Sequence, residues 1–213
     1  MERIRDRGLR RGDGKWTLPF PTFRDEKNEP LTAIRQSGDR EYREEELSVC
    51  ACADEASAAH YAWTHNRHGD LDTPVMIEFE ANADDVAVDG RDILYTLFQI
   101  GDPDKATVAV RKVYGKAAIR HLEAAWTADD QMQRLAHCDK AVLDPAVVAH
   151  HYRNRTVVAG RHRTLFSSAF QVRLPIGPGA IRNVYVPEQR AILAPPEIRI
   201  DEIVKREPSR GPR

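Results

Sequence analysis

The chain has 213 residues, of which 41% are hydrophobic and 31% are charged, and its formal net charge is −1. This length is enough for one domain with a hydrophobic core, and the composition is that of an ordinary soluble protein. A net charge this close to zero excludes a global field that would attract the protein to nucleic acid or to an anionic membrane, so a nucleic-acid site would have to be a local patch.

We infer the cellular location of the protein from three features that its sequence lacks. No apolar run approaches the roughly 20 residues needed to cross a bilayer. The first 15 residues lack the apolar segment of a secretory signal. The three cysteines are an odd number, which argues against a disulfide framework. We therefore expect a cytoplasmic protein that does not engage a membrane.

The termini are expected to be mobile, and the rest of the chain to form one domain. Residues 1–15 are rich in arginine and glycine and predict a flexible basic arm, and residues 205–213 predict a flexible tail. Residues 16–204 are expected to fold as a single α+β domain.

The first half of this domain predicts alternating strands and helices. The stretch 47–53, LSVCACA, reads as a strand, and Asp54 is a suitable N-cap for an alanine-rich helix over 55–65. Residues 75–81, VMIEFEA, alternate apolar and polar side chains and predict a second strand. Residues 93–100 are almost wholly apolar, which predicts burial but fits a strand or a helix equally well.

A helical insertion is predicted over about 104–155. Gly115 is expected to divide its first part, Thr127 and Asp130 resemble a capping box, and Asp144-Pro145 predicts the start of its last helix. Strand patterns return after Arg155. The order is strand-rich, helical, strand-rich, which indicates an α+β fold with a helical insertion between two strand-rich halves.

The cysteines suggest a metal site at first sight, but the spacing of ligands does not support one. On a strand, Ser48, Cys50 and Cys52 share one face. Zinc requires about four ligands in tetrahedral reach, and only His137 and Cys138, far away in the sequence, could add to the pair. We therefore predict no metal and expect the cysteines to be small buried side chains.

A cationic stretch runs from His150 to Thr164. Its basic side chains could form an anion or nucleic-acid site, because arginine binds phosphate through two hydrogen bonds. The alternative is a solvated surface paired with acidic neighbours. The candidate residues are Arg153, Arg155, Arg161, His162 and Arg163.

The order of elements around residues 47–81 resembles the ADP-ribosyltransferase-like family. The matching pieces are Ser48, the helix segment ADEASAAHYA and the strand over 75–81, and the late segment AILAPPEIRI is similar to the family's closing strand and turn. The resemblance covers roughly 48–81 and 184–203 and leaves 89–174 as an insertion. It implies a split β-sandwich that binds NAD and transfers ADP-ribose to a protein or nucleic-acid acceptor.

The resemblance also implies roles for particular residues. Ser48 matches the serine of the second motif, Tyr61 lies where an aromatic ring could stack on nicotinamide, and Glu188 is the candidate for the catalytic glutamate. Arg190 occupies the position directly before the apolar pair, where the family places that glutamate. The first motif is absent, and Arg24 or Arg35 stands in as the group that holds the pyrophosphate.

The cleavage of NAD requires groups with these roles. Cleaving the bond between nicotinamide and ribose builds positive charge on the sugar, and a nearby carboxylate stabilises it. Two alternatives remain: a nucleic-acid-binding or RNA-processing protein that uses the cationic stretch, with Tyr152 and Phe166 as stacking groups, and a non-catalytic interaction protein with an enzyme-like fold.

Overall fold

The structure is a computed structural model, and it describes residues 1–13, 17–21, 43–64, 73–100, 102–160, 165–187 and 192–204. The helices are α1 (Glu2–Arg7), α2 (Glu55–Thr64), α3 (Arg91–Ile100), α4 (Pro103–Tyr114), α5 (Ile119–Thr127), α6 (Gln131–Leu143), α7 (Pro145–Arg153) and α8 (Ile200–Ile203). The strands are β1 (Thr17–Pro19), β2 (Leu47–Cys52), β3 (Met76–Phe79), β4 (Val86–Val88), β5 (Val158–Ala159), β6 (Leu165–Phe166), β7 (Ala169–Arg173), β8 (Ile181–Tyr185) and β9 (Ile198–Arg199).

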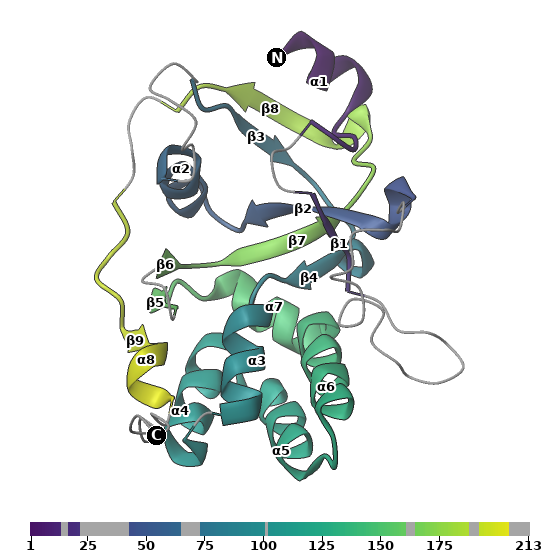
Figure 1. Cartoon of the computed structure of the whole chain (residues 1–213). Coiled ribbons are helices and arrows are strands. Elements are labelled where there is room, and N and C mark those ends of the chain that lie inside the picture. The colour runs from purple at the N-terminus through teal and green to yellow at the C-terminus, as the bar shows by residue number, and fades with distance from the viewer. Residues whose placement is uncertain are drawn as a thin grey trace, which may run out of the picture.

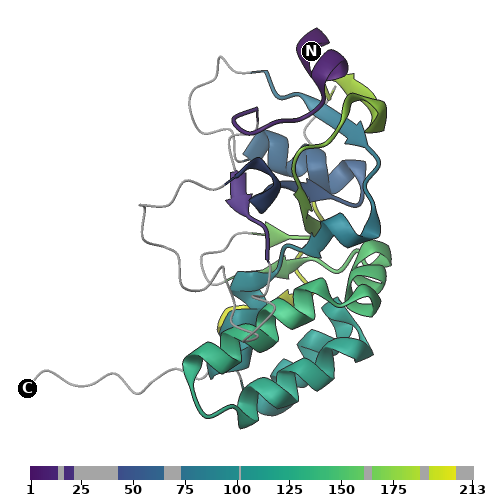
Figure 2. The ribbon, with the colours of Figure 1, turned by 90° about the vertical axis from the view of Figure 1, so that its right-hand side faces the viewer.

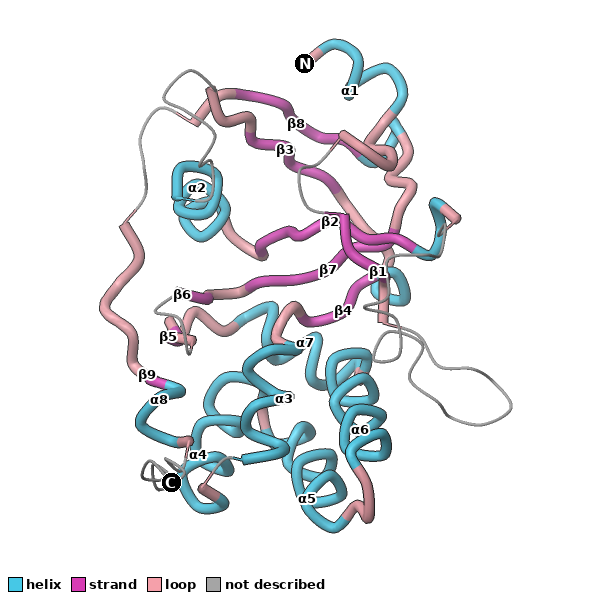
Figure 3. The backbone as a smooth tube through the Cα atoms, in the orientation of Figure 1, coloured by secondary structure: helices cyan, strands magenta, loops and turns pink. Residues whose placement is uncertain are grey.

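The chain is an α+β protein whose strands form three small sheets. The largest sheet has the order β1-β2-β7-β4, and all its neighbours are antiparallel. Strands β3 and β8 form an antiparallel pair, and β5 lies between β6 and β9, parallel only to β9. Figures 1 and 3 show the strands of the first two sheets in the upper part of the molecule and helices α3 to α7 gathered below them. The α+β prediction with a central helical segment is confirmed.

The two faces of the four-stranded sheet differ in character because successive side chains of a strand point to opposite faces. Val49 lies opposite Val172, which lies opposite Val86 on β4. These valines share one face with Phe170 and Val88, which are buried in the core against the helices. This face is therefore the apolar side of the sheet.

Two clusters fill the interior behind that apolar side. The larger one joins the sheet to α3, α4, α5 and α6, with Leu94, Phe98 and Leu122 fully buried. The smaller one packs Val49 and Val172 against side chains from the chain's beginning and from the β3–β8 pair. Figure 2 shows the teal and green helices, α3 to α7, as one block at the end of the molecule opposite the β3–β8 pair.

Local sequence signals place most helix boundaries. The carboxylates of Asp102, Asp130 and Asp144 each accept hydrogen bonds from backbone N–H groups in the first turn of α4, α6 and α7. The capping box predicted at Thr127 is wrong in detail: Asp130 is itself the cap, and Thr127 ends α5. Gly115 ends α4 with φ 85°, a left-handed conformation that glycine adopts without strain.

Residues 93–100, whose sequence fitted either state, belong to helix α3. The preceding residue, Gly90, is required by packing, because a Cβ atom there would lie 2.3 Å from the Tyr114 hydroxyl. In the described part of the chain, no helix is both long enough and apolar enough to cross a membrane.

The first residues differ from the expected flexible arm. They form α1, and Leu9 is buried in the smaller cluster, where its backbone pairs with that of Ile176. The Arg5 guanidinium also donates a hydrogen bond to the carbonyl of Val184 at 3.1 Å. The apolar Ile4 and Leu9, hidden among charged residues in the sequence, supply the contacts that attach this segment. The predicted tail at 205–213 lies outside the described residues.

Candidate functional site

Opposite the valines, the four-stranded sheet presents polar side chains. Cys50 pairs with Gln171, which pairs with Ala87, so these residues point to the side away from the valines. Ser48 and Cys52 share that side by the period of two, and Asp89 continues it beyond the end of β4. We call Ser48, Cys50, Cys52, Asp89 and Gln171 the polar face.

Hydrogen bonds connect the polar face across three strands. The Ser48 hydroxyl donates to the carbonyl of Leu18 at 2.9 Å and lies 3.4 Å from Oε1 of Gln171. The Gln171 amide then donates from Nε2 to Oδ1 of Asp89 at 3.3 Å. Ser48 and Gln171 are both buried, with 0% and 3% exposure. Gln171 thus fixes the serine and the carboxylate at the two ends of one chain of contacts.

The two thiols of the polar face are held in their neutral form. Withdrawal from water, and then the negative charge of Asp89, raise the pKa of Cys50 far above its ordinary value. Burial, followed by the charges of Asp54 and Asp89, raises the pKa of Cys52 to about 12. By accessible surface Cys50 is nevertheless exposed and Cys52 is half-buried, so the prediction that these two cysteines are buried is wrong. Neutral thiols are poor nucleophiles and poor metal ligands.

Tyr61 on α2 lies beside the polar face. Its hydroxyl donates to the carbonyl of Leu165 at 2.8 Å and accepts from the backbone N–H of Ser167 at 3.1 Å. Burial raises its pKa and the negative charge of Asp89 acts in the same direction, whereas the hydrogen bond from the Ser167 N–H acts in the opposite one. These two hydrogen bonds anchor the ring between α2 and the β6–β7 turn, close to Cys52 and Asp89, whereas Ser48 lies near the opposite end of β2.

A second polar network surrounds Asp54 at the start of α2. As predicted, its carboxylate caps the helix, accepting from the backbone N–H of Ser57 at 2.9 Å. It also accepts from the Ser168 hydroxyl at 2.5 Å and pairs with Nε of Arg155 at 3.1 Å. Burial acts to raise the pKa of Asp54, but the hydrogen bonds from Ser168 and Ser57 and the charge of Arg155 lower it overall.

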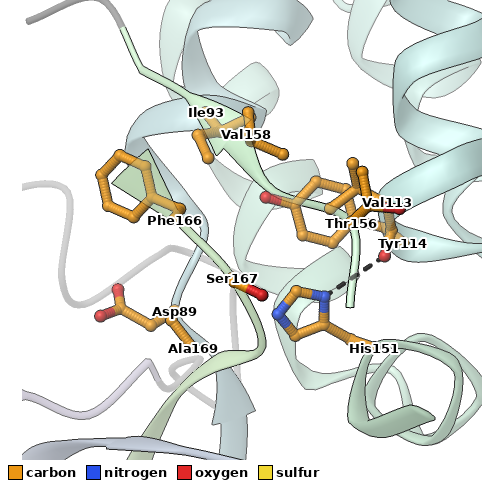
Figure 4. Close-up of a pocket in the computed structure, with 10 residues that line it drawn as sticks. All are labelled: Asp89, Ile93, Val113, Tyr114, His151, Thr156, Val158, Phe166, Ser167 and Ala169. Carbon is orange, nitrogen blue, oxygen red and sulfur yellow. Dashed lines mark hydrogen bonds between the residues drawn. The ribbon is translucent and has the colours of Figure 1, made fainter. Parts of the chain in front are cut away.

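A cavity of about 10 Å³ lies where α4, α7, β5 and β7 meet, next to Asp89 at the end of β4. This volume is on the order of what one water molecule requires. Asp89 and Ser167 border it, and so does the imidazole of His151, which is 5% exposed. Nδ1 of His151 donates to the carbonyl of Val113 at 3.2 Å, while Nε2 is buried without a hydrogen-bond partner among the described residues (Figure 4).

Burial lowers the pKa of His151 to about 4, although the carbonyls of Val113 and Ala169 act in the opposite direction. The imidazole is therefore neutral at pH 7. It serves as a packed hydrogen-bonding group, stacked on Tyr114 with 5.4 Å between ring centroids, and its low pKa makes it a weak proton acceptor.

The other predicted site residues fall into two groups. Arg153 and Arg155 are at the end of α7, where Arg153 is exposed and Arg155 is paired with Asp54. The remainder lie outside the described residues: Glu188, Arg24, Arg35, Arg161, His162 and Arg163. Within the described ranges, no three His, Cys, Asp or Glu side chains are grouped so that they could hold a metal ion.

Three residues of this region were not predicted from the sequence. Asp89 was read as part of a plain turn, Gln171 lies within an apolar strand, and His151 was read as part of the cationic stretch. One signal was available: Ala87 and Asp89 have the spacing that places both on one face of a strand. The sequence around Gln171 and around His151 contains no comparable pattern.

Comparisons with known proteins add no further assignment. No family model, no curated protein and no solved structure matches the chain. The functional argument therefore depends on the geometry described above.

Proposed function

We propose that the protein is an NAD-dependent ADP-ribosyltransferase-like enzyme that transfers ADP-ribose to a protein or nucleic-acid acceptor. In this proposal the nucleotide binds over the accessible part of the polar face, at Cys50, Cys52 and Asp89 and beside the ring of Tyr61, while the fully buried Ser48 stabilises this face through Gln171. The fold is then a split β-sandwich, with the four-stranded sheet and the β3–β8 pair as its two halves and α3 to α7 as an insertion.

One observation carries this proposal: the hydrogen-bonded chain from Ser48 through Gln171 to Asp89, next to the anchored ring of Tyr61. A buried serine and amide that reach a carboxylate across three strands are costly to bury unless they are satisfied. The network holds the partly exposed Asp89 in place, and a carboxylate beside an aromatic ring suits a ligand that combines hydroxyl groups with a flat ring.

The roles of the reacting groups come from the family resemblance. Glu188 stabilises the positive charge that develops on the ribose and orients the acceptor. Arg24 or Arg35 holds the pyrophosphate. Tyr61 packs against the nicotinamide, and its two hydrogen bonds keep the ring in a fixed orientation.

The test is incubation of the purified protein with NAD, with nicotinamide release followed by chromatography and NAD binding followed by thermal shift. We expect release by the wild type and a fall of about 10²-fold or more in Glu188→Gln, the magnitude typical of a lost electrostatic contact in the transition state. Glu197→Gln is the matched control, because Glu197 is a half-exposed acid that pairs with Lys112 on the surface. Absence of both release and an NAD-induced thermal shift would overturn the proposal.

A nucleic-acid-binding role is the second candidate, and one observation favours it. Tyr152 is 59% exposed and Arg153 beside it is exposed at the end of α7, the arrangement of a stacking group next to a phosphate contact. RNA affinity that falls steeply with added salt and is lost in Arg153→Ala would support it. Affinity unchanged between low and high salt would count against it.

A further inference from the structure

We propose that Asp89 is the carboxylate of the polar face that contacts the positively charged nicotinamide–ribose end of NAD. This assignment rests on the proposed function and adds a residue that the family resemblance does not supply. It also fixes the orientation of the bound NAD. The cationic end of the dinucleotide lies at β4 and β7, and its pyrophosphate lies elsewhere.

The backbone holds Asp89 in a defined position. Its N–H donates to the carbonyl of Ala169 at 2.9 Å, and the next residue, Gly90, begins α3 by accepting a hydrogen bond from the N–H of Leu94 at 2.8 Å. Asp89 therefore follows β4 directly and is separated from α3 by Gly90 alone. A side chain between two such elements is fixed more precisely than one on a long loop.

Neighbouring side chains orient the carboxylate. Gln171 donates to Oδ1 from the adjacent strand, and the Cys50 thiol forms a hydrogen bond with the same carboxylate. In Figure 4 the carboxylate points away from the imidazole of His151, although both residues border the cavity. The charge is thus directed toward the polar face.

The negative charge of Asp89 reaches the side chains around it. Its negative charge contributes to the raised pKa of three different groups: Cys50, Cys52 and Tyr61. These groups lie on β2 and α2, so the carboxylate is within electrostatic reach of both elements that frame the proposed nucleotide site. A cation bound among them would gain the same interaction with the opposite sign.

The chemistry of NAD matches this charge. The nicotinamide ring of NAD is a pyridinium cation, and a carboxylate close to it favours binding of this end over the anionic pyrophosphate. When the bond between ribose C1′ and the ring nitrogen breaks, its electron pair passes to the nitrogen and nicotinamide leaves neutral. The positive charge moves to the ribose, and the acceptor then forms the new bond to C1′ and releases its proton. The Asp89 carboxylate faces positive charge throughout.

The experiment compares two probes of nearly the same shape and different charge, the cation N1-methylnicotinamide and neutral nicotinamide, by calorimetric titration. We expect the wild type to bind the cation about tenfold or more tightly than the neutral probe, a ratio typical of one close charge contact. Asp89→Asn keeps the size of the side chain and an oxygen for Gln171, and is expected to abolish this preference. Asp84→Asn, at an exposed position five residues earlier, is the matched control and should retain it.

Asp89→Glu, which keeps the charge, should restore the preference for the cation, and added NaCl should reduce it in the wild type. If the asparagine variant does not fold, Asp89→Ser serves as the uncharged variant and should likewise lose the preference. A preference that persists in Asp89→Asn, or that is indifferent to salt, would overturn the role of Asp89 while leaving NAD binding intact. A wild type that binds neither NAD nor the two probes would overturn the proposed function itself.

Discussion

Replacing His151 by glutamine removes a buried group whose charged form is incompatible with the folded state. The imidazole packs between Tyr114 and Phe170, and burial lowers its pKa from the ordinary 6.5 to about 4. The unfolded chain therefore binds a proton between pH 6.5 and pH 4 that the folded chain does not bind. Stability falls as the pH falls through this range, because the unfolded state takes up more protons.

The size of the effect follows from the two pKa values. A difference of about 2.5 pKa units corresponds to about 3 kcal/mol once the pH is below both values, and to about 2.5 kcal/mol at pH 4.5. At pH 7 the contribution is close to zero. Glutamine does not titrate, and its amide can still donate to the carbonyl of Val113, so it isolates the protonation of this histidine.

The assay is urea unfolding of wild type and His151→Gln at pH 7 and pH 4.5, analysed as a two-state transition. The wild type should lose about 2.5 kcal/mol more than the variant on acidification. His150→Gln is the control, since His150 is the adjacent, less buried histidine, and it should lose as much as the wild type. Equal losses in wild type and His151→Gln would refute a buried neutral His151.

Three further predictions concern the helix caps and the thiols. Asp54→Ala should destabilise the protein by about 2 kcal/mol in urea unfolding, because the cap of α2 and the partner of Arg155 are lost together; an unchanged midpoint would contradict this. Asp130→Ala should cost about 1 kcal/mol through loss of the α6 cap alone, and a larger loss than for Asp54→Ala would reverse the ranking. Cys52 should react with iodoacetamide at pH 8 about 10²-fold more slowly than in the urea-unfolded chain, since its pKa is about 12; equal rates, measured by mass spectrometry, would exclude a raised pKa.

The elements that the sequence predicted well are those with a strong local pattern. Alternation places β2 and β3, and Asp54 and Asp144 mark the starts of α2 and α7 through side-chain bonds within a few residues. Residues 93–100 could not be assigned, because an almost wholly apolar run satisfies both periods. Its helical state depends on its packing with α5 and α6, which no local pattern records.

The sequence predicted only those residues of the candidate site that stand in a recognisable local motif. Ser48 and Tyr61 were singled out, and both lie at the polar face or beside it. Gln171, which links Ser48 to Asp89, lies 123 residues from Ser48 in the sequence, within an otherwise apolar strand. The pairing of β2 with β7 brings them together, and strand pairing over such a separation follows from the packing of the whole domain.

The same limit applies to Arg155. In the sequence it belongs to a run of basic residues that suggests an anion site. In the fold its guanidinium meets the cap of α2, about a hundred residues earlier in the chain, and acts as a counter-ion for Asp54. A cationic run therefore indicates the sign of a surface, while tertiary packing decides which of its charges remain available to a ligand.

Mapping NAD binding by backbone amide chemical shifts tests the central claim most directly, because it reports the place of binding independently of turnover. The account predicts shifts that saturate with NAD and concentrate on β2, β7, the β4–α3 junction around Asp89 and the C-terminal half of α2 around Tyr61. No shifts at millimolar NAD, or shifts confined to the end of α7 around Arg153, would contradict a nucleotide site on the polar face.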